Sequence, residues 1–130
     1  MVKRFFLGRD VRLKSEIVLP GGDVVKVDTN VSADRLALNR AFNETLKPAT
    51  VYAKDPTPEN TEAFYRKYAE FVRLILGDKA YSKALKAYDG DTVELCRQLD
   101  RWIAAAFVPK LQEASRQELE NRKKIFKIGK

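Results

Sequence analysis

The first regular pattern of apolar residues along the chain is a pair of short runs separated by a turn sequence. Residues 16–19 and 24–28 are rich in β-branched side chains, and Pro-Gly-Gly-Asp lies between them. Proline fixes φ and glycine permits positive φ, which a tight chain reversal needs. The pattern predicts a β-hairpin. An isolated hairpin is marginal in water, so we expect either a further strand around 4–7 or 11–13, or a helix beneath the ribbon.

Beyond the hairpin, apolar residues recur at helical spacing. Leu38, Phe42 and Leu46 follow one another four residues apart. This spacing predicts the buried stripe of a helix, with Ala41 and Thr45 beside it.

The ends of this helix are predicted from capping and breaking residues. Asn30 or Ser32 can cap its start, so that it begins near Ser32. It should end before Pro48, because residues 48–58 contain three prolines and are expected to form a connection.

A second helix has strong signals at both ends. Thr57 is the expected N-cap, Pro58 takes the first helical position, and Gly77 is a natural stop. An aromatic stripe at helical spacing belongs to a core more often than to a ligand site, so its apolar face is assigned to the core. This face comprises Phe64, Tyr68, Phe71, Val72, Ile75 and Leu76.

Two more helices follow. Asp78 can cap a short one, which Asp89 and Gly90 break. Asp91 precedes Glu94 by three residues, the spacing of a capping box that opens the next helix. The apolar residues of that helix share one face, which makes its single cysteine a core residue: Cys96, Leu99, Ile103, Ala106 and Phe107.

The segment after Pro109 is predicted to be a separate arm. An internal proline kinks or restarts a helix, and residues 111–127 are helix-prone but mostly polar. We expect this arm to project or to dock on another chain, and to contribute little to the stability of residues 16–108. Its apolar residues are too sparse to build a core: Leu111, Ala114, Leu119, Ile125, Phe126 and Ile128.

Together these elements predict a mainly α fold with a small N-terminal β-hairpin, in the α+β class, built as a compact helical domain with a projecting C-terminal helix. A chain of 130 residues has the size of one ordinary domain. We divide it into a β-ribbon region at 1–30, a helical core at 31–109 and a basic C-terminal helix or tail at 110–130.

Composition argues against an enzyme. The chain contains no histidine and one cysteine, which removes the commonest general base, the commonest metal ligand and every Ser-His or Cys-His pair. A single cysteine cannot supply the usual zinc ligands either. We therefore expect no catalytic site, no metal and no cofactor, although catalysis by carboxylates alone needs no histidine.

The same composition predicts a cytoplasmic protein. No apolar run approaches the roughly 20 residues of a membrane helix. The first ten residues lack the apolar stretch and cleavage site of a secretory signal, and one cysteine cannot form an intramolecular disulfide. We expect no membrane association.

The positive charge is concentrated at the two ends. The whole chain carries a formal charge of +7, of which residues 1–14 and residues 110–130 each contribute +4, while the remainder carries −1. The basic ends could meet phosphate or an acidic protein surface, or serve only as solubilising charge. Basic and aromatic residues do not alternate as they do in a single-strand binding groove.

The order of elements resembles the small tail assembly chaperones of long-tailed phages and prophages of Gram-positive bacteria. The resemblance covers most of residues 16–127 and lies in the layout and in the segment from Phe71 to Cys96. That segment contains the apolar helix end Phe71 to Gly77, a Gly-containing turn, and Leu95-Cys96 near the start of the long helix.

The resemblance implies a non-catalytic chaperone that coats the tape measure protein during tail morphogenesis in the bacterial host cytoplasm. Whether the chain forms a homo-oligomer stays open. Such a protein needs exposed apolar patches and no catalytic residues. The alternatives are a small basic nucleic-acid-associated protein and a structural phage tail component. The residues that we expect to contact a partner lie on the C-terminal arm: Leu111, Leu119, Arg122, Lys123, Lys124 and Phe126.

Overall fold

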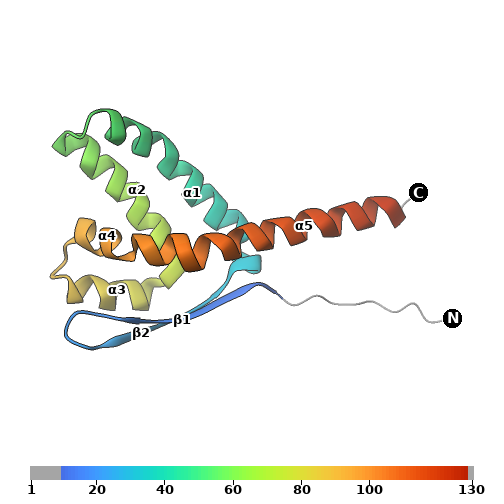
Figure 1. Cartoon of the computed structure of the whole chain (residues 1–130), viewed down its shortest axis with the longest axis horizontal. Helices are drawn as coiled ribbons and strands as arrows, with labels where there is room; N and C mark the ends of the chain where they lie inside the picture. Colours follow the sequence, from blue (N-terminus) through green and yellow to red (C-terminus); the bar gives the residue numbers. More distant parts are fainter. Residues whose placement is uncertain (1–9, 129–130) are drawn as a thin grey trace.

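The computed structural model describes residues 10–128, with side chains described as far as Lys124. An antiparallel ribbon of β1 (Arg12–Val18) and β2 (Val24–Asn30) leads into a series of helices (Figure 1). The predicted fold class, mainly α with an N-terminal hairpin, is confirmed. The helices are α1 (Val31–Lys54), α2 (Pro58–Leu76), α3 (Asp78–Ala87), α4 (Thr92–Trp102), the π-helical turn η1 (Ile103–Phe107) and α5 (Val108–Ile128).

The predicted hairpin is present, with longer strands than the apolar runs suggested. Gly21 and Gly22 adopt φ of 91° and 97°, the region that only glycine enters freely. β1 begins at Arg12, so the expected further strand around 11–13 is the first part of β1 itself. The other expected strand, around 4–7, lies outside the described residues.

The ribbon lies on the helices, as an isolated hairpin must. Every second residue of β2, from Val25 to Thr29, is buried against them. The Thr29 hydroxyl donates a hydrogen bond to the backbone carbonyl of Ile75 near the end of α2. On β1, Ser15 Oγ accepts a hydrogen bond of 3.0 Å from Trp102 Nε1.

Helix α1 is longer than predicted because it continues through Pro48 to Lys54. Asn30 caps its start, as one of the two predicted caps, through a 3.0 Å bond from the Ala33 N–H. Pro48 leaves the carbonyl of Glu44 without its helical partner, but Glu44 is exposed and water can bond to the carbonyl. The predicted connection over residues 48–58 is therefore wrong, and only residues 55–57 join α1 to α2.

The buried face of α1 is also rotated from the predicted one. Leu38 is fully buried, and Ala41 and Thr45 beside it are buried where α1 packs against α2. Phe42 and Leu46, the other two members of the predicted stripe, are 36% and 49% exposed. Their four-residue spacing does place them on one face, but much of that face is open among the described residues.

Helix α2 has the predicted boundaries. Thr57 Oγ1 accepts the N–H of Asn60 at 3.2 Å, and Gly77 ends the helix with a φ of 85°. The C-terminal half of the predicted apolar face is buried, whereas Phe64 and Tyr68 in the N-terminal half are only partly buried. The buried residues are Phe71, Val72, Ile75 and Leu76.

Helices α3 and α4 form with one change at a cap. Asp78 is the first residue of α3 and not its cap, and its carboxylate accepts a 2.6 Å hydrogen bond from Arg73 Nε. Asp91 caps α4 by accepting the Glu94 N–H at 3.1 Å, as predicted. The Glu94 side chain bonds to Gln98 instead of closing a capping box.

Pro109 does not break the helix that precedes it. The π-helical turn η1 inserts one extra residue, and the Val108 N–H bonds to the Ile103 carbonyl five residues back. A π-turn redistributes the backbone hydrogen bonds next to the proline, which has no N–H to donate. The chain therefore runs from η1 into α5 without an interruption.

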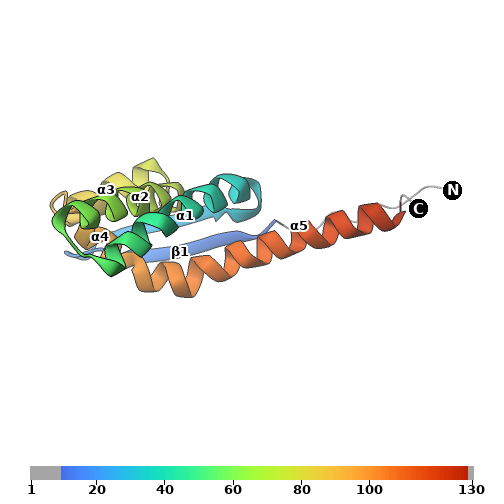
Figure 2. The same cartoon turned by 90° about the horizontal axis from the view of Figure 1, so that it is seen from above.

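The inner part of α5 (residues 108–118) belongs to the core, contrary to the prediction of a separate arm. Leu111 and Ala114 are 6% and 3% exposed. Asn39 Nδ2 of α1 donates a 3.4 Å hydrogen bond to Ser115 Oγ. The outer part of α5 (residues 119–128) extends away from the other elements in both views (Figures 1 and 2).

Candidate protein-binding surface

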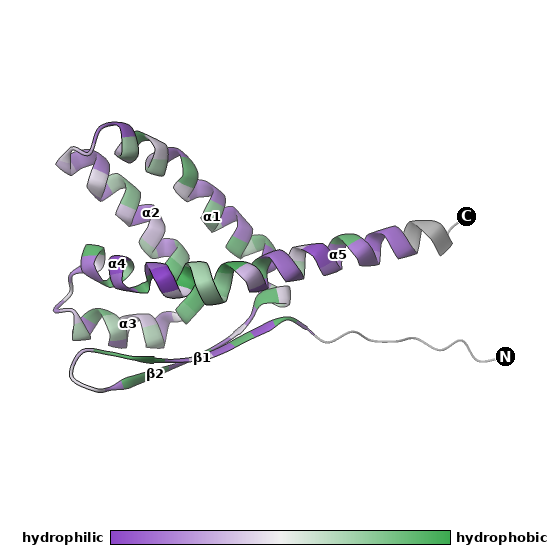
Figure 3. Cartoon of the chain, in the orientation of Figure 1, coloured by the Kyte–Doolittle hydropathy of each residue, from purple (hydrophilic) through white to green (hydrophobic). Residues whose placement is uncertain are grey.

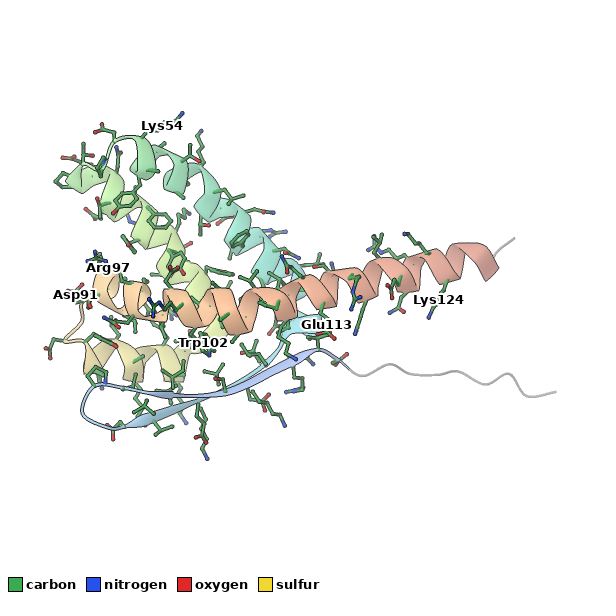
Figure 4. The ribbon with its side chains drawn as sticks, viewed as in Figure 1. Lys54, Asp91, Arg97, Trp102, Glu113 and Lys124 are labelled. Atoms are coloured by element: carbon green, nitrogen blue, oxygen red, sulfur yellow. The ribbon has the colours of Figure 1, made fainter. Side chains whose placement is uncertain are left out.

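The hairpin formed by α1 and α2 extends beyond the core. The last buried residue of α1 is Thr45 and the first of α2 is Phe71, so residues 46–70 hold no fully buried side chain. In Figure 4 this half of the hairpin points away from the ribbon, with Lys54 at its tip. Contacts between the two helices, together with contacts from α2 to α3 and α4, hold this half in place.

Aromatic side chains make contacts between the two helices. The Tyr52 ring of α1 stacks on the Phe64 ring of α2 with centroids 5.5 Å apart. The ring centroid of Phe64 lies 4.9 Å from that of Tyr65 and 5.6 Å from that of Tyr68. Aromatic pairs prefer such offset and tilted arrangements, which stabilise them by about 0.5–1.5 kcal/mol beyond the burial of area.

Phe71 joins these rings to the core. Its centroid lies 6.3 Å from Tyr68, 5.5 Å from Phe42 and 5.5 Å from Phe107 of η1. Phe71 and Phe107 are fully buried, whereas the rings farther along the hairpin are partly exposed. We call the partly exposed set the aromatic strip: Phe42, Tyr52, Phe64, Tyr65 and Tyr68.

Leu46 extends the apolar surface next to the aromatic strip. It lies one helical turn beyond Phe42 on α1, where residues four apart are neighbours on the surface, and it is 49% exposed. Partly exposed aromatic rings with an exposed leucine beside them resemble the centres of protein interfaces more than an ordinary solvated surface.

A hollow of about 340 Å³ opens between α2 and α4 beside the aromatic strip. The Tyr68 hydroxyl donates a 2.8 Å hydrogen bond to Asp100 across it. Burial, and then this hydrogen bond, raise the pKa of Tyr68, so its hydroxyl stays a neutral donor. Arg97, which Figure 4 shows on the side of α4 near α2, supplies a cation at the rim.

Cys96 lies at the base of this hollow but has no solvent exposure. Burial raises the pKa of its thiol to about 12, so the thiol is protonated near neutral pH. Because the thiolate is the nucleophile, this cysteine has the properties of an inert core residue. The prediction that Cys96 belongs to the core is confirmed.

The described residues hold neither a metal-binding cluster nor a membrane-spanning helix. Between residues 10 and 128, no group of His, Cys, Asp and Glu side chains is arranged to hold a metal ion. Over the same part of the chain, every helix is too short or too polar to cross a bilayer.

The predicted partner-binding residues of the C-terminal arm fall in three environments. Leu111 is buried in the core, so it cannot contact a partner from the surface, and its assignment is corrected. Leu119 is 55% exposed. The side chain of Phe126 lies outside the described residues.

The basic residues of the arm are on the surface. Arg122 is exposed and forms a 3.3 Å ion pair with Glu118, which also lies 3.9 Å from Arg35 of α1. Lys123 and Lys124 are exposed on the outer part of α5. This part of α5 is mostly hydrophilic in Figure 3, whereas the helices are hydrophobic where the end of α2 meets η1.

No protein-family model, curated protein or solved structure matches this chain. The function is therefore inferred from its surfaces. Two of them stand out: the aromatic strip on the hairpin of α1 and α2, and the basic outer part of α5.

Proposed function

We propose that this chain is a non-catalytic chaperone that holds an apolar helical segment of a partner protein on its aromatic strip. The observation that carries the proposal is the hairpin of α1 and α2, whose outer half presents a row of partly exposed aromatic rings. A tail assembly chaperone acting on the tape measure protein, in the cytoplasm of a bacterial host, is the specific role proposed.

The chemistry of the aromatic strip suits a helix with an apolar face. Aromatic rings contribute a large apolar area at a low cost in side-chain entropy. From Phe64 to Phe71, α2 rises by roughly 10 Å at 1.5 Å per residue, which matches about two turns of a second helix. Partner residues spaced three and four apart would then lie along the strip, as in other helix-in-groove complexes.

Charges around these surfaces favour an acidic partner. Arg97 and Asp100 both line the hollow, so its charges balance, and the positive surface is that of the exposed lysines on the outer part of α5. Charges at the rim of an interface mainly raise the association rate and select against wrong partners. A long helical protein with acidic stretches fits both surfaces.

Co-expression with the products of the neighbouring genes tests this proposal. The chain should co-purify with a long helical protein, and Leu46→Glu should reduce the amount captured by about tenfold, since it places a charge beside the strip. Leu74→Glu is the matched control, because Leu74 is 47% exposed on α2 and lies beside Ala37 and Ala41, away from the rings of the strip.

Other results would favour the competing functions. Retention on DNA that collapses with added salt and weakens in Lys123→Ala or Lys124→Ala would indicate a nucleic-acid protein. Stable rings or tubes of the purified chain would indicate a structural tail component. Equal capture by the parent and Leu46→Glu would show that the aromatic strip is not the binding surface.

A further inference from the structure

The outer edge of β1 has backbone groups that the ribbon does not use. At one end of the strand pair the Leu19 N–H donates to the backbone carbonyl of Asp23 at 2.7 Å. At the other end the Val31 N–H donates to the backbone carbonyl of Val11 at 2.9 Å. In an antiparallel pair, hydrogen-bonded and non-hydrogen-bonded residues alternate. The odd-numbered residues of β1 therefore bond to β2, and the even-numbered residues direct their N–H and C=O groups outward.

The four outward residues are Arg12, Lys14, Glu16 and Val18, and all four are exposed. Within residues 10–128, no backbone hydrogen bond links them to anything beyond β2. The outer edge of β2 differs, because α3 lies beside it and Lys83 Nζ donates to the Val24 carbonyl at 3.1 Å. β1 is thus the open edge of the ribbon.

We infer that β1 pairs with β1 of a second copy of this chain, antiparallel and centred on Ser15, to form a four-stranded sheet. In this register each outward residue faces an outward residue of the other copy, so every free N–H and C=O along the edge gains a partner. Lys14 lies opposite Glu16 of the second copy. The two-fold symmetry repeats that pair, as an interface between identical copies requires.

Charge favours this register. Moving the centre of symmetry to Lys14 would place Arg12 opposite Glu16 of the second copy but would also place the two copies of Lys14 opposite each other, and moving it to Glu16 would do the same for the glutamates with no attractive pair. Like charges directly opposite one another destabilise a sheet, whereas opposite charges stabilise it. The register with the most residues paired over β1 is therefore also the one with complementary charges.

Both faces of the joined strands are compatible with this pairing. On the inner face, Leu13 lies opposite Ile17 of the second copy, so the half-buried Ile17 gains an apolar neighbour. On the outer face, Val18 is 70% exposed and lies opposite the aliphatic stem of Arg12. The pairing covers apolar surface and buries no unpaired charge.

Sedimentation of the full chain, with proline substitutions on the two edges, tests the geometry. Glu16→Pro removes an outward N–H of β1 and should leave a folded monomer at concentrations where the parent is a dimer. Lys26→Pro is the matched control, because Lys26 lies directly opposite Glu16 in the ribbon and its N–H points to the other edge. Equal dimerisation of the two folded variants would overturn the inference.

Charge substitutions test the register, with folding checked by circular dichroism. K14E and E16K should each weaken self-association by about tenfold or more, since each turns two attractive pairs into repulsive ones. An equimolar mixture should recover the parent's association as a mixed dimer, because the altered strands complement each other. A parent that stays monomeric at about 100 µM, or a mixture no better than either variant alone, would contradict this pairing.

Discussion

Phe71 is the residue at which the aromatic strip meets the core. Its side chain is fully buried between Phe42 and Phe107. Phe71→Ala should lower the free energy of unfolding by about 3–5 kcal/mol, the usual cost of emptying a buried phenylalanine site. Urea denaturation measures it, with Phe42→Ala as the control that should cost less because Phe42 is 36% exposed. An unchanged midpoint in Phe71→Ala would contradict the burial.

The Cys96 thiol should be unreactive in the folded chain. Burial raises the pKa of its thiol from 9.0 to about 12, so the reactive thiolate is scarce at pH 8. A disulfide reagent should modify the chain slowly in buffer and rapidly in urea. Rapid modification of the folded chain would show that the residue is accessible.

The raised pKa of Cys96 also predicts a loss of stability at alkaline pH. Above about pH 9 the unfolded chain loses the thiol proton while the folded chain keeps it until about pH 12, so ionisation favours unfolding across that window. The thermal midpoint should fall more steeply between about pH 8 and 10.5 in the parent than in Cys96→Ala. Parallel curves would indicate that this thiol ionises alike in both states.

Local rules at single residues were enough to predict most of the caps and turns, although Asp78 is not the cap of α3. Thr57, Asp91 and Gly77 act where predicted because a cap depends only on neighbouring backbone groups. Phe42 and Leu46 could not be assigned in this way. Helical spacing places them on one face, but whether a neighbour covers that face depends on where α5 crosses α1, which a single helix does not encode.

Among the elements, both prolines that were expected to end helices lie within them. Pro48 is tolerated because Tyr52 and the residues near it gain contacts with α2 that an ended helix would lose. Pro109 is tolerated because the π-turn η1 precedes it. At Pro48 the packing of the long helix outweighs the local cost of about 3 kcal/mol for a helical proline, whereas at Pro109 the π-turn lowers that cost.

Truncations distinguish the inner part of α5 from its outer part. A chain ending at Lys110 loses the buried Leu111 and Ala114 and should unfold at least about 6 °C lower, since emptying one leucine site alone costs about 2–5 kcal/mol. A chain ending at Glu120 keeps both residues and should stay within about 3–6 °C of the parent. Equal thermal midpoints for the parent and the chain ending at Lys110 would show that α5 does not pack on the core.

For the whole molecule, the sequence predicts the fold class and locates only part of the candidate surface. The basic residues of the outer part of α5 are recognisable because a polar helix has little apolar area with which to dock. Three members of the aromatic strip, Phe42, Phe64 and Tyr68, are predicted to be core residues, since their spacing is that of a buried stripe. The strip becomes a surface only because the hairpin of α1 and α2 is longer than the elements that pack on it (Figure 1).

The ribbon and the tip of the hairpin lie on opposite sides of the molecule in Figure 1. A dimer joined through β1 would therefore leave both aromatic strips open, and each copy could hold its own helical segment. Two separate surfaces also make self-association and partner binding separable by substitution. K14E should weaken the first and spare the second.

Calorimetric titration of the captured helical segment into the purified chain tests the central claim most directly. Binding to the parent should show a negative heat-capacity change, the mark of apolar burial. Leu46→Glu should weaken the affinity by about tenfold or more, while Leu74→Glu, with a leucine of nearly equal exposure, should leave it unchanged. Equal affinities of the parent and Leu46→Glu, together with a steep loss of binding in salt, would contradict the account.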